Sequence, residues 1–330
     1  MLVSLLLLAS CEHHHLYYAA TKTATIEVRV DWTPALLKKL QLNGVTAVAY
    51  DNNTGDLHQI YPTFNGTDSV YLCPLPVGNY DLVFFNNTPS EYQYQKINNF
   101  SKRKTFSTSY VSREPVRPAS KTEYKEIPAI YAPEILAAAT VENIEVTPEQ
   151  IDIFYNKPDY YYTENIHKYH VLAERKIMTW VYTAKVKGLT YAYSAPYAHL
   201  YHHRSAFLLG LDKKKTDIVL QEFVWNNRTW LDNNKQDGHI RAEFTSFGRH
   251  PYYNDKMRTL DVDFLLLDGK IHKIQVPITN EMIKDSIDRK DGVLKHWVHV
   301  EFELPTAIGD GTDSGFKPDV GEWDDVIVDL

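Results

Sequence analysis

Hydrophobic and polar residues alternate with a period of two along much of the chain. In residues 24–31, Ile26, Val28 and Val30 fall on one face and mostly polar side chains fall on the other. This pattern is typical of a β-strand with one buried face. Similar segments recur about every ten residues between turns rich in Gly and Asn, which favours a sandwich of antiparallel sheets. In the first part of the chain we expect strands at residues 24–31, 45–50, 57–61 and 70–73.

A loop that leads into a core strand is expected at residues 75–86. Two prolines remove backbone donors, Gly78 permits a positive φ, and Tyr80, Leu82 and Phe84 then share one face. This arrangement is typical of a corner in a β-sandwich.

Prolines interrupt regular structure between residues 111 and 133, so we place a domain junction near residue 135. The elements expected beyond it are a helical turn at 148–153 with Thr147 as a possible N-cap, and strands at 167–188, 218–224, 240–244, 260–267, 271–276 and 297–304. The chain is thus predicted to be all-β, with two antiparallel β-sandwich domains in tandem at residues 24–135 and 136–330.

Two local patterns refine the second half. Asp268-Gly269 predicts a hairpin turn, because this dipeptide tolerates the left-handed conformation of type I′ turns. In the strand at 177–186, one apolar face is expected to comprise Met178, Trp180, Tyr182, Ala184 and Val186.

The composition is that of a globular protein, with 44% hydrophobic and 13% aromatic residues. The formal net charge of −7 gives no basic footprint of the kind that nucleic-acid-binding proteins have. Basic residues gather in 102–125 and acidic residues in 301–330, and a solvated surface explains both segments.

The N-terminal sequence Leu8-Ala9-Ser10-Cys11 resembles the lipobox of bacterial lipoproteins. In that pattern the peptide is cut before the cysteine, which then carries acyl chains. The resemblance implies a signal peptide at residues 1–10, lipidation of Cys11, a lipidated tether at 11–23 and a location at the outer membrane. Three acyl chains exceed the number that stable membrane anchoring requires.

The alternatives for this segment are an uncleaved N-terminus or a buried strand. An apolar run as short as residues 1–10 cannot span a bilayer core of about 30 Å. Residues 1–3 lack the Lys or Arg that normally precede the apolar part, so we expect the true start to lie upstream. If Cys11 is acylated, Cys73 is the one remaining cysteine and no intrachain disulfide can form.

Few residues in the sequence suggest catalysis or metal binding. Asp261 and Asp263 project to one face of a predicted strand, as the carboxylate pair of a glycosidase does, although a solvated face explains them too. On a strand, His199 and His203 would share a face while His202 points away, which disfavours one-metal geometry. No metalloprotease, nucleophile-elbow or phosphate-loop motif is found in the sequence. We therefore predict a protein without enzymatic activity, metal or cofactor.

Aromatic side chains offer a second class of function. Tyr160, Tyr161, Trp225 and Trp230 are candidates for stacking on sugar rings, because aromatic faces suit such contacts. A surface glycan-binding lipoprotein is accordingly the alternative function.

Three motifs carry a family resemblance when they are taken together: Leu8-Ala9-Ser10-Cys11-Glu12 before an aromatic tether, Leu75-Pro76-x-Gly78-x-Tyr80-x-Leu82, and the closing Trp323 with Asp325, Val326 and Val328. They resemble the fimbrillin-like lipoproteins of Bacteroides-type bacteria. Within that group they resemble a domain-of-unknown-function family that is similar to fimbrial anchor subunits. The resemblance implies two transthyretin-like, immunoglobulin-like β-sandwich domains, an outer-membrane lipid anchor and no catalytic residues.

The resemblance also implies that subunits join by strand addition. An open sheet edge can accept a partner strand through main-chain hydrogen bonds. The candidate segments are marked by Ile26, Val28 and Val30 and by Val326, Val328 and Leu330, and the alternative is that both strands complete their own sheets. The predicted function is a structural, anchor or accessory subunit in fimbrial assembly or cell adhesion. Its predicted partners are the membrane, through Cys11, and fimbrillin-like subunits.

Overall fold

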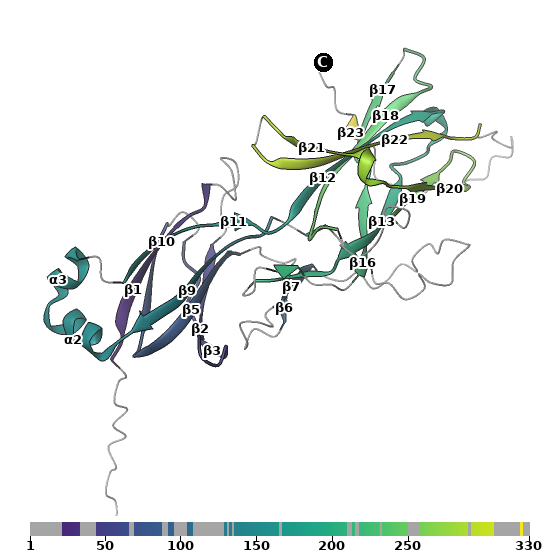
Figure 1. Cartoon of the computed structure of the whole chain (residues 1–330). Coiled ribbons are helices and arrows are strands. Elements are labelled where there is room, and N and C mark those ends of the chain that lie inside the picture. Colours follow the sequence, from purple (N-terminus) through teal and green to yellow (C-terminus); the bar gives the residue numbers. More distant parts are fainter. Residues whose placement is uncertain are drawn as a thin grey trace, which may run out of the picture.

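The computed structural model describes most of the chain, and the structural statements below concern that part. The described residues are 22–33, 44–65, 69–87, 92–95, 104–107, 129–130, 132–133, 135–164, 167–209, 213–214, 218–231, 233–249, 258–289, 292–306 and 324–325. The fold is mostly β, as the alternating pattern predicts. Figure 1 shows two lobes, with most of the early strands in one and most of the later strands in the other.

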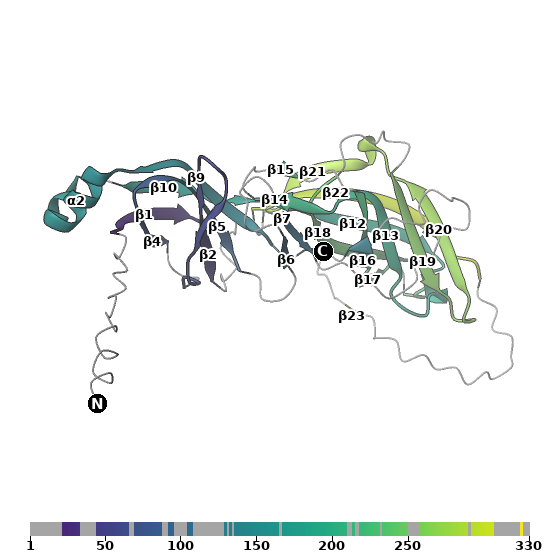
Figure 2. The same ribbon diagram turned by 90° about the horizontal axis from the view of Figure 1, so that it is seen from below.

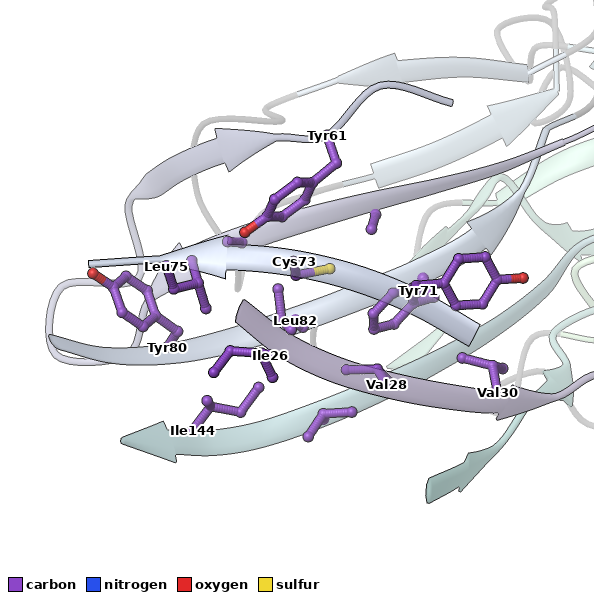
Figure 3. Packing of buried hydrophobic residues seen from close by; sticks show 14 of the residues in the cluster. Ile26, Val28, Val30, Tyr61, Tyr71, Cys73, Leu75, Tyr80, Leu82 and Ile144 are labelled. Carbon is purple, nitrogen blue, oxygen red and sulfur yellow. The ribbon is translucent and has the colours of Figure 1, made fainter. Parts of the chain in front are cut away.

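Two sheets pack face to face in the first lobe. The three-stranded sheet has the order β10 (Lys168–Leu172), β1 (Ala24–Asp31), β4 (Val70–Leu75). The five-stranded sheet has the order β11 (Glu174–Arg175), β9 (Ala137–Val146), β5 (Gly78–Asn86), β2 (Val45–Asp51), β3 (Leu57–Ile60). Their facing side chains form the first core, in which Figure 3 shows Ile26 and Val28 of β1 near Leu82 and Ile144. The predicted buried face of β1 is therefore confirmed.

The strand β5 is buried on both faces. Tyr80, Leu82 and Phe84 enter the first core, as the sequence predicts. Val83 and Phe85 point the other way and enter a third core that lies between the lobes. The lobe therefore has no solvent-exposed face along residues 80–86 of this strand.

Two short helices, α2 (Pro148–Asn156) and α3 (Pro158–Thr163), lie at the end of the first lobe. Thr147 is the N-cap of α2 and forms a capping box. Its side-chain hydroxyl oxygen accepts a hydrogen bond from the backbone N–H of Gln150, and the Gln150 side-chain oxygen accepts one from the backbone N–H of Thr147. The predicted helical turn is confirmed and extends to Asn156. Among the described residues, no helix has the length and apolar character needed to cross a membrane.

The second lobe also consists mainly of two sheets. The six-stranded sheet has the order β21 (Ile283–Ile287), β22 (Leu294–Glu303), β12 (Met178–Lys187), β18 (Gly238–Ser246), β17 (Asn227–Trp230), β23 (Asp324–Asp325). The five-stranded sheet has the order β20 (Ile271–Pro277), β19 (Thr259–Leu265), β13 (Tyr197–Arg204), β16 (Ile218–Val224), β8 (Ala129–Ile130). Trp180, Tyr182, Ala184 and Val186 of β12 lie in the core between them, which confirms the predicted apolar face. Single 3-10 turns occur at Leu189–Tyr191 and Asn280–Met282.

A four-stranded sheet joins strands from the two halves of the sequence, in the order β15 (Lys213–Lys214), β14 (Ala206–Leu208), β7 (Lys104–Ser107), β6 (Tyr92–Gln95). Figure 2 shows these strands between the two lobes. Near them, the third core includes Val83 and Phe85 of β5, Phe207 of β14, and Phe247, which follows β18 of the second lobe. The lobes are therefore joined by a hydrophobic contact as well as by the chain.

The predicted domain junction near residue 135 does not coincide with a division between sheets. β9 and β10 follow it in sequence, yet β9 pairs with β5 and β10 pairs with β1 in the first lobe. β7 precedes it, yet pairs with β14. A proline-rich composition favours an interruption of regular structure, but strand pairing decides where a lobe ends.

Candidate functional site

The edges of the sheets are the first candidate surface, because an edge strand presents backbone donors and acceptors to a partner. Within the described part of the chain, β4 and β10 form the edges of the three-stranded sheet, and β20 and β21 are edges in the second lobe. Exposed apolar side chains lie on each of these strands or at its end: Leu72, Leu172, Ile271 and Ile287. These edge strands, which have no further strand beside them among the described residues, thus also carry exposed apolar side chains.

The strand β1 is not one of these edges. β10 pairs with it in parallel on one side and β4 pairs with it antiparallel on the other. Ile26, Val28 and Val30 are fully buried in the first core. This corrects the expectation that the strand is open to a partner, since it completes its own sheet. The second candidate segment, with Val326, Val328 and Leu330, lies outside the described residues.

Two of the four predicted sugar-stacking residues are buried. Tyr161 packs into the first core and its hydroxyl donates to the Thr25 carbonyl at 2.7 Å. Trp225 packs into the core of the second lobe against Phe223 and Phe302. The prediction is wrong for both residues, because no ring face is available to a sugar.

The other two predicted stacking residues lie in different lobes. Tyr160 is exposed on α3, whereas Trp230 is half-buried on β17 with the Arg228 guanidinium 4.8 Å from its ring centroid. Figure 1 places α3 and β17 at opposite ends of the molecule. The structure therefore does not bring these two rings into one sugar site.

A cluster of tyrosines at α2 and α3 was not predicted as a unit. Tyr155, Tyr160 and Tyr162 are 50%, 52% and 41% exposed, whereas Tyr161 between them is buried. Phe154 contacts Tyr155, Tyr161 and Tyr162 with ring centroids 5.0 to 6.3 Å apart. The run of three tyrosines was visible in the sequence. The helix that buries Tyr161 and leaves Tyr160 and Tyr162 exposed was not predicted.

Asp261 and Asp263 project to the same face of β19, as predicted, and both are half-buried. Asp261 accepts hydrogen bonds from the Tyr201 hydroxyl at 2.8 Å and from the Gln275 amide at 2.9 Å. Burial raises the pKa of the Asp263 carboxyl, and Lys273 and His199 partly oppose this rise. The two hydrogen bonds give Asp261 a structural role in the sheet.

The three histidines do not share one face. A bulge between Leu200 and His203 interrupts the alternation of β13, and His202 has a positive φ of 65°. His199 therefore lies 3.8 Å from Glu222, whereas His203 packs inward with its ring centroid 5.4 Å from that of Trp180. This corrects the expectation that His199 and His203 share a face. No group of three His, Cys, Asp or Glu side chains among the described residues is placed to hold a metal ion.

Of the two cysteines, Cys11 and Cys73, the structure describes only Cys73. Cys11, the predicted site of lipidation, lies outside the described residues. Cys73 is fully buried in the first core, and burial raises the pKa of its thiol to about 12. Because the thiolate is the reactive species, Cys73 is a packing residue rather than a nucleophile.

A family model described as a domain of unknown function, DUF5119, matches residues 10–223. The chain belongs to this family. The predicted membership of a domain-of-unknown-function family is thereby confirmed. A comparison with curated proteins finds no match for this DUF5119 protein.

Among solved structures, the DUF5119 protein is similar to a candidate adhesin from Bacteroides ovatus, with 10% identity and a TM-score of 0.54 over 88% of this chain and 95% of that one. At this identity the match shows a shared fold. A candidate polysaccharide-binding protein from Bacteroides thetaiotaomicron has 10% identity and a TM-score of 0.49 over 86% and 92% of the two chains. The fimbrial anchor protein Mfa2 from Porphyromonas gingivalis has 13% identity and a TM-score of 0.45 over 83% and 95%. These last two scores are below 0.5 and establish no closer relationship.

Proposed function

We propose that this DUF5119 protein is a non-enzymatic outer-membrane lipoprotein that acts as an anchor or accessory subunit in fimbrial assembly or cell adhesion. The observation that carries the proposal is the fold shared with a candidate adhesin along nearly the whole of both chains. The lipobox-like sequence that ends at Cys11 supports membrane attachment. The two lobes support the further inference of two transthyretin-like β-sandwich domains, with the first extending to about β11.

We further infer that fimbrillin-like subunits join this protein by β-strand addition. Open edges with exposed apolar side chains support this inference, since a partner strand would pair with the backbone and cover those side chains. In the segment 326–330, Val326, Val328 and Leu330 would share one face of a strand, which suits a donor strand that buries that face.

Pull-down from detergent-solubilised outer membranes tests the proposal. We expect the native protein to recover fimbrillin-like subunits, and we expect a variant with Val326, Val328 and Leu330 changed to Thr to recover them poorly. Leu267→Thr is the matched control, because Leu267 is an apolar residue that is 58% exposed in the turn between β19 and β20 and lies on none of the edge strands. A native protein that recovers no such subunit would contradict the assembly role.

Surface glycan binding is less well supported. Of the four residues on which it rested, two are buried and the other two lie in separate lobes. One sugar chain would have to bridge both lobes to contact Tyr160 and Trp230. Glycan arrays with the native protein and with Tyr160→Ala test this alternative, since Tyr160 is exposed and its loss leaves both cores intact.

A further inference from the structure

The exposed tyrosines of α2 and α3 form a surface beside the point where the described chain begins. We call Tyr155, Tyr160 and Tyr162 the tyrosine cap. Lys22 is the first described residue, and its ammonium nitrogen lies 5.5 Å from the centroid of the Tyr155 ring. Figures 1 and 2 both place the start of β1 next to α2, at the end of the molecule away from β20. The described part of the chain therefore begins at the cap.

The length of that segment limits how far the cap can lie from the acyl chains. Ten residues separate Cys11 from Lys22. The eleven Cα–Cα steps from Cys11 to Lys22, at about 3.5 Å each in an extended chain, reach at most roughly 40 Å. An anchored protein thus holds the cap close to the membrane surface, where even a weak contact is favoured by its high effective concentration.

The side chains of the cap suit the boundary between lipid and water. Tyrosine has an apolar ring and a polar hydroxyl, and it is enriched at the head-group level of membranes for that reason. Phe154 contacts the rings of Tyr155 and Tyr162, and Tyr161 also contacts the ring of Tyr162. The Tyr161 hydroxyl ties α3, which carries Tyr160 and Tyr162, to β1. The cap is therefore a fixed surface of the first lobe.

We propose that the tyrosine cap rests on the lipid head groups of the membrane that holds Cys11. The inference depends on the proposed lipid anchor and adds a second contact, which would set the orientation of the lobes above the membrane. Charges around the cap are nearly balanced: Glu149, Asp152, Asp159 and Glu164 are acidic, and Lys22, Lys157 and Lys168 are basic. A zwitterionic head group fits this balance better than a strongly anionic surface, which would attract a polybasic patch.

Site-directed spin labelling of the acylated full-length protein tests the proposal. Tyr160→Cys introduces one reactive thiol at an exposed position, because Cys73 is fully buried and its thiol has a pKa raised to about 12 by burial. Leu267→Cys is the matched control, since Leu267 is 58% exposed in the hairpin between β19 and β20. Both proteins are placed in vesicles of phosphatidylethanolamine and phosphatidylcholine, and collisions with oxygen and with a water-soluble nickel complex are measured.

We expect the label at residue 160 to collide severalfold more with oxygen and severalfold less with the nickel complex when vesicles are present. The label at residue 267 should be unchanged. Equal, water-like behaviour of both labels on vesicle-bound protein would overturn the proposal. Loss of nickel collisions without a gain in oxygen collisions would also overturn it, because the cap would then be covered by protein.

Failure of the anchor itself gives a different result. If acylation at Cys11 is absent, the protein does not sediment with vesicles and neither label changes, which overturns the proposed anchor and the cap contact together. A second variant checks the cap without a label. Changing Tyr155, Tyr160 and Tyr162 to Ser should leave acylated protein on the vesicles but increase cleavage by added protease between Cys11 and Lys22. Unchanged cleavage would count against the cap.

Discussion

Tyr161 ties α3 to β1 with one hydrogen bond and a buried ring. We expect Tyr161→Phe to lower the free energy of unfolding by about 1 kcal/mol, because the ring stays and the Thr25 carbonyl loses its 2.7 Å donor. Tyr161→Ala should cost about 3–5 kcal/mol, since it also leaves a cavity in the first core. Urea unfolding measures both values. Tyr160→Phe is the control and should have no effect, because Tyr160 is exposed.

His167 is expected to make stability depend on pH. Burial lowers the pKa of its imidazole, and its Nε2 atom has no hydrogen-bond partner in the described part of the structure. As the pH falls, His167 is therefore protonated at a higher pH in the unfolded chain than in the folded protein. The free energy of unfolding should consequently fall as the pH drops below about 6.5.

Measurement of unfolding between pH 7.5 and 5 tests this dependence. His167→Asn should reduce the slope while keeping the backbone, because His167 has a positive φ of 58° that Asn tolerates. His170→Asn is a suitable control, since His170 is exposed on β10. An unchanged slope in His167→Asn would show that other groups control acid unfolding.

At the scale of elements, Thr147 contributes through the capping box of α2. We expect Thr147→Ala to cost about 1 kcal/mol of unfolding free energy, because it removes the acceptor for the Gln150 amide. Thr147→Ser should restore most of the loss, since serine is an equally good N-cap. Thermal unfolding followed by circular dichroism distinguishes the two variants, and equal melting temperatures would contradict the assigned role.

The sequence predicted elements better than it predicted their partners. β16 begins and ends at the expected residues, and α2 begins after its predicted cap, because alternation and capping are local properties. Alternation shows which face of a strand is buried but not which strand lies beside it. The parallel pairing of β10 with β1 therefore could not be read from the sequence.

The sequence predicted the place of one turn but not its conformation, and it did not predict the bulge in β13. Asp268-Gly269 does connect β19 and β20, but only Gly269 has a positive φ, whereas a type I′ turn requires two such residues. Leu266 and Lys270 close a three-residue loop instead. The bulge in β13 has no sequence signal, and it is what separates His199 from His203.

At the scale of the whole molecule, burial of aromatic rings was the hardest feature to predict. An aromatic residue in a strand pattern suits either a core or an exposed binding face, so the sequence alone could not place Tyr161 or Trp225 inside. Alternation likewise predicts one buried face for β5. Its second buried face depends on contact with the other lobe, which is a property of the assembled chain.

This contact between the lobes leads to a prediction about cooperativity. We expect the lobes of the native protein to unfold together in calorimetry, because Phe85 of the first lobe lies in one core with Phe207 of β14 and Phe247 of the second lobe. Phe85→Ala should lower stability by about 3–5 kcal/mol and split the transition in two, since it opens a cavity at the contact. Phe84→Ala is the matched control on the same strand: its ring lies only in the first core, so one transition should remain at a lower temperature. Two separate transitions in the native protein would mean that the third core does not couple the lobes.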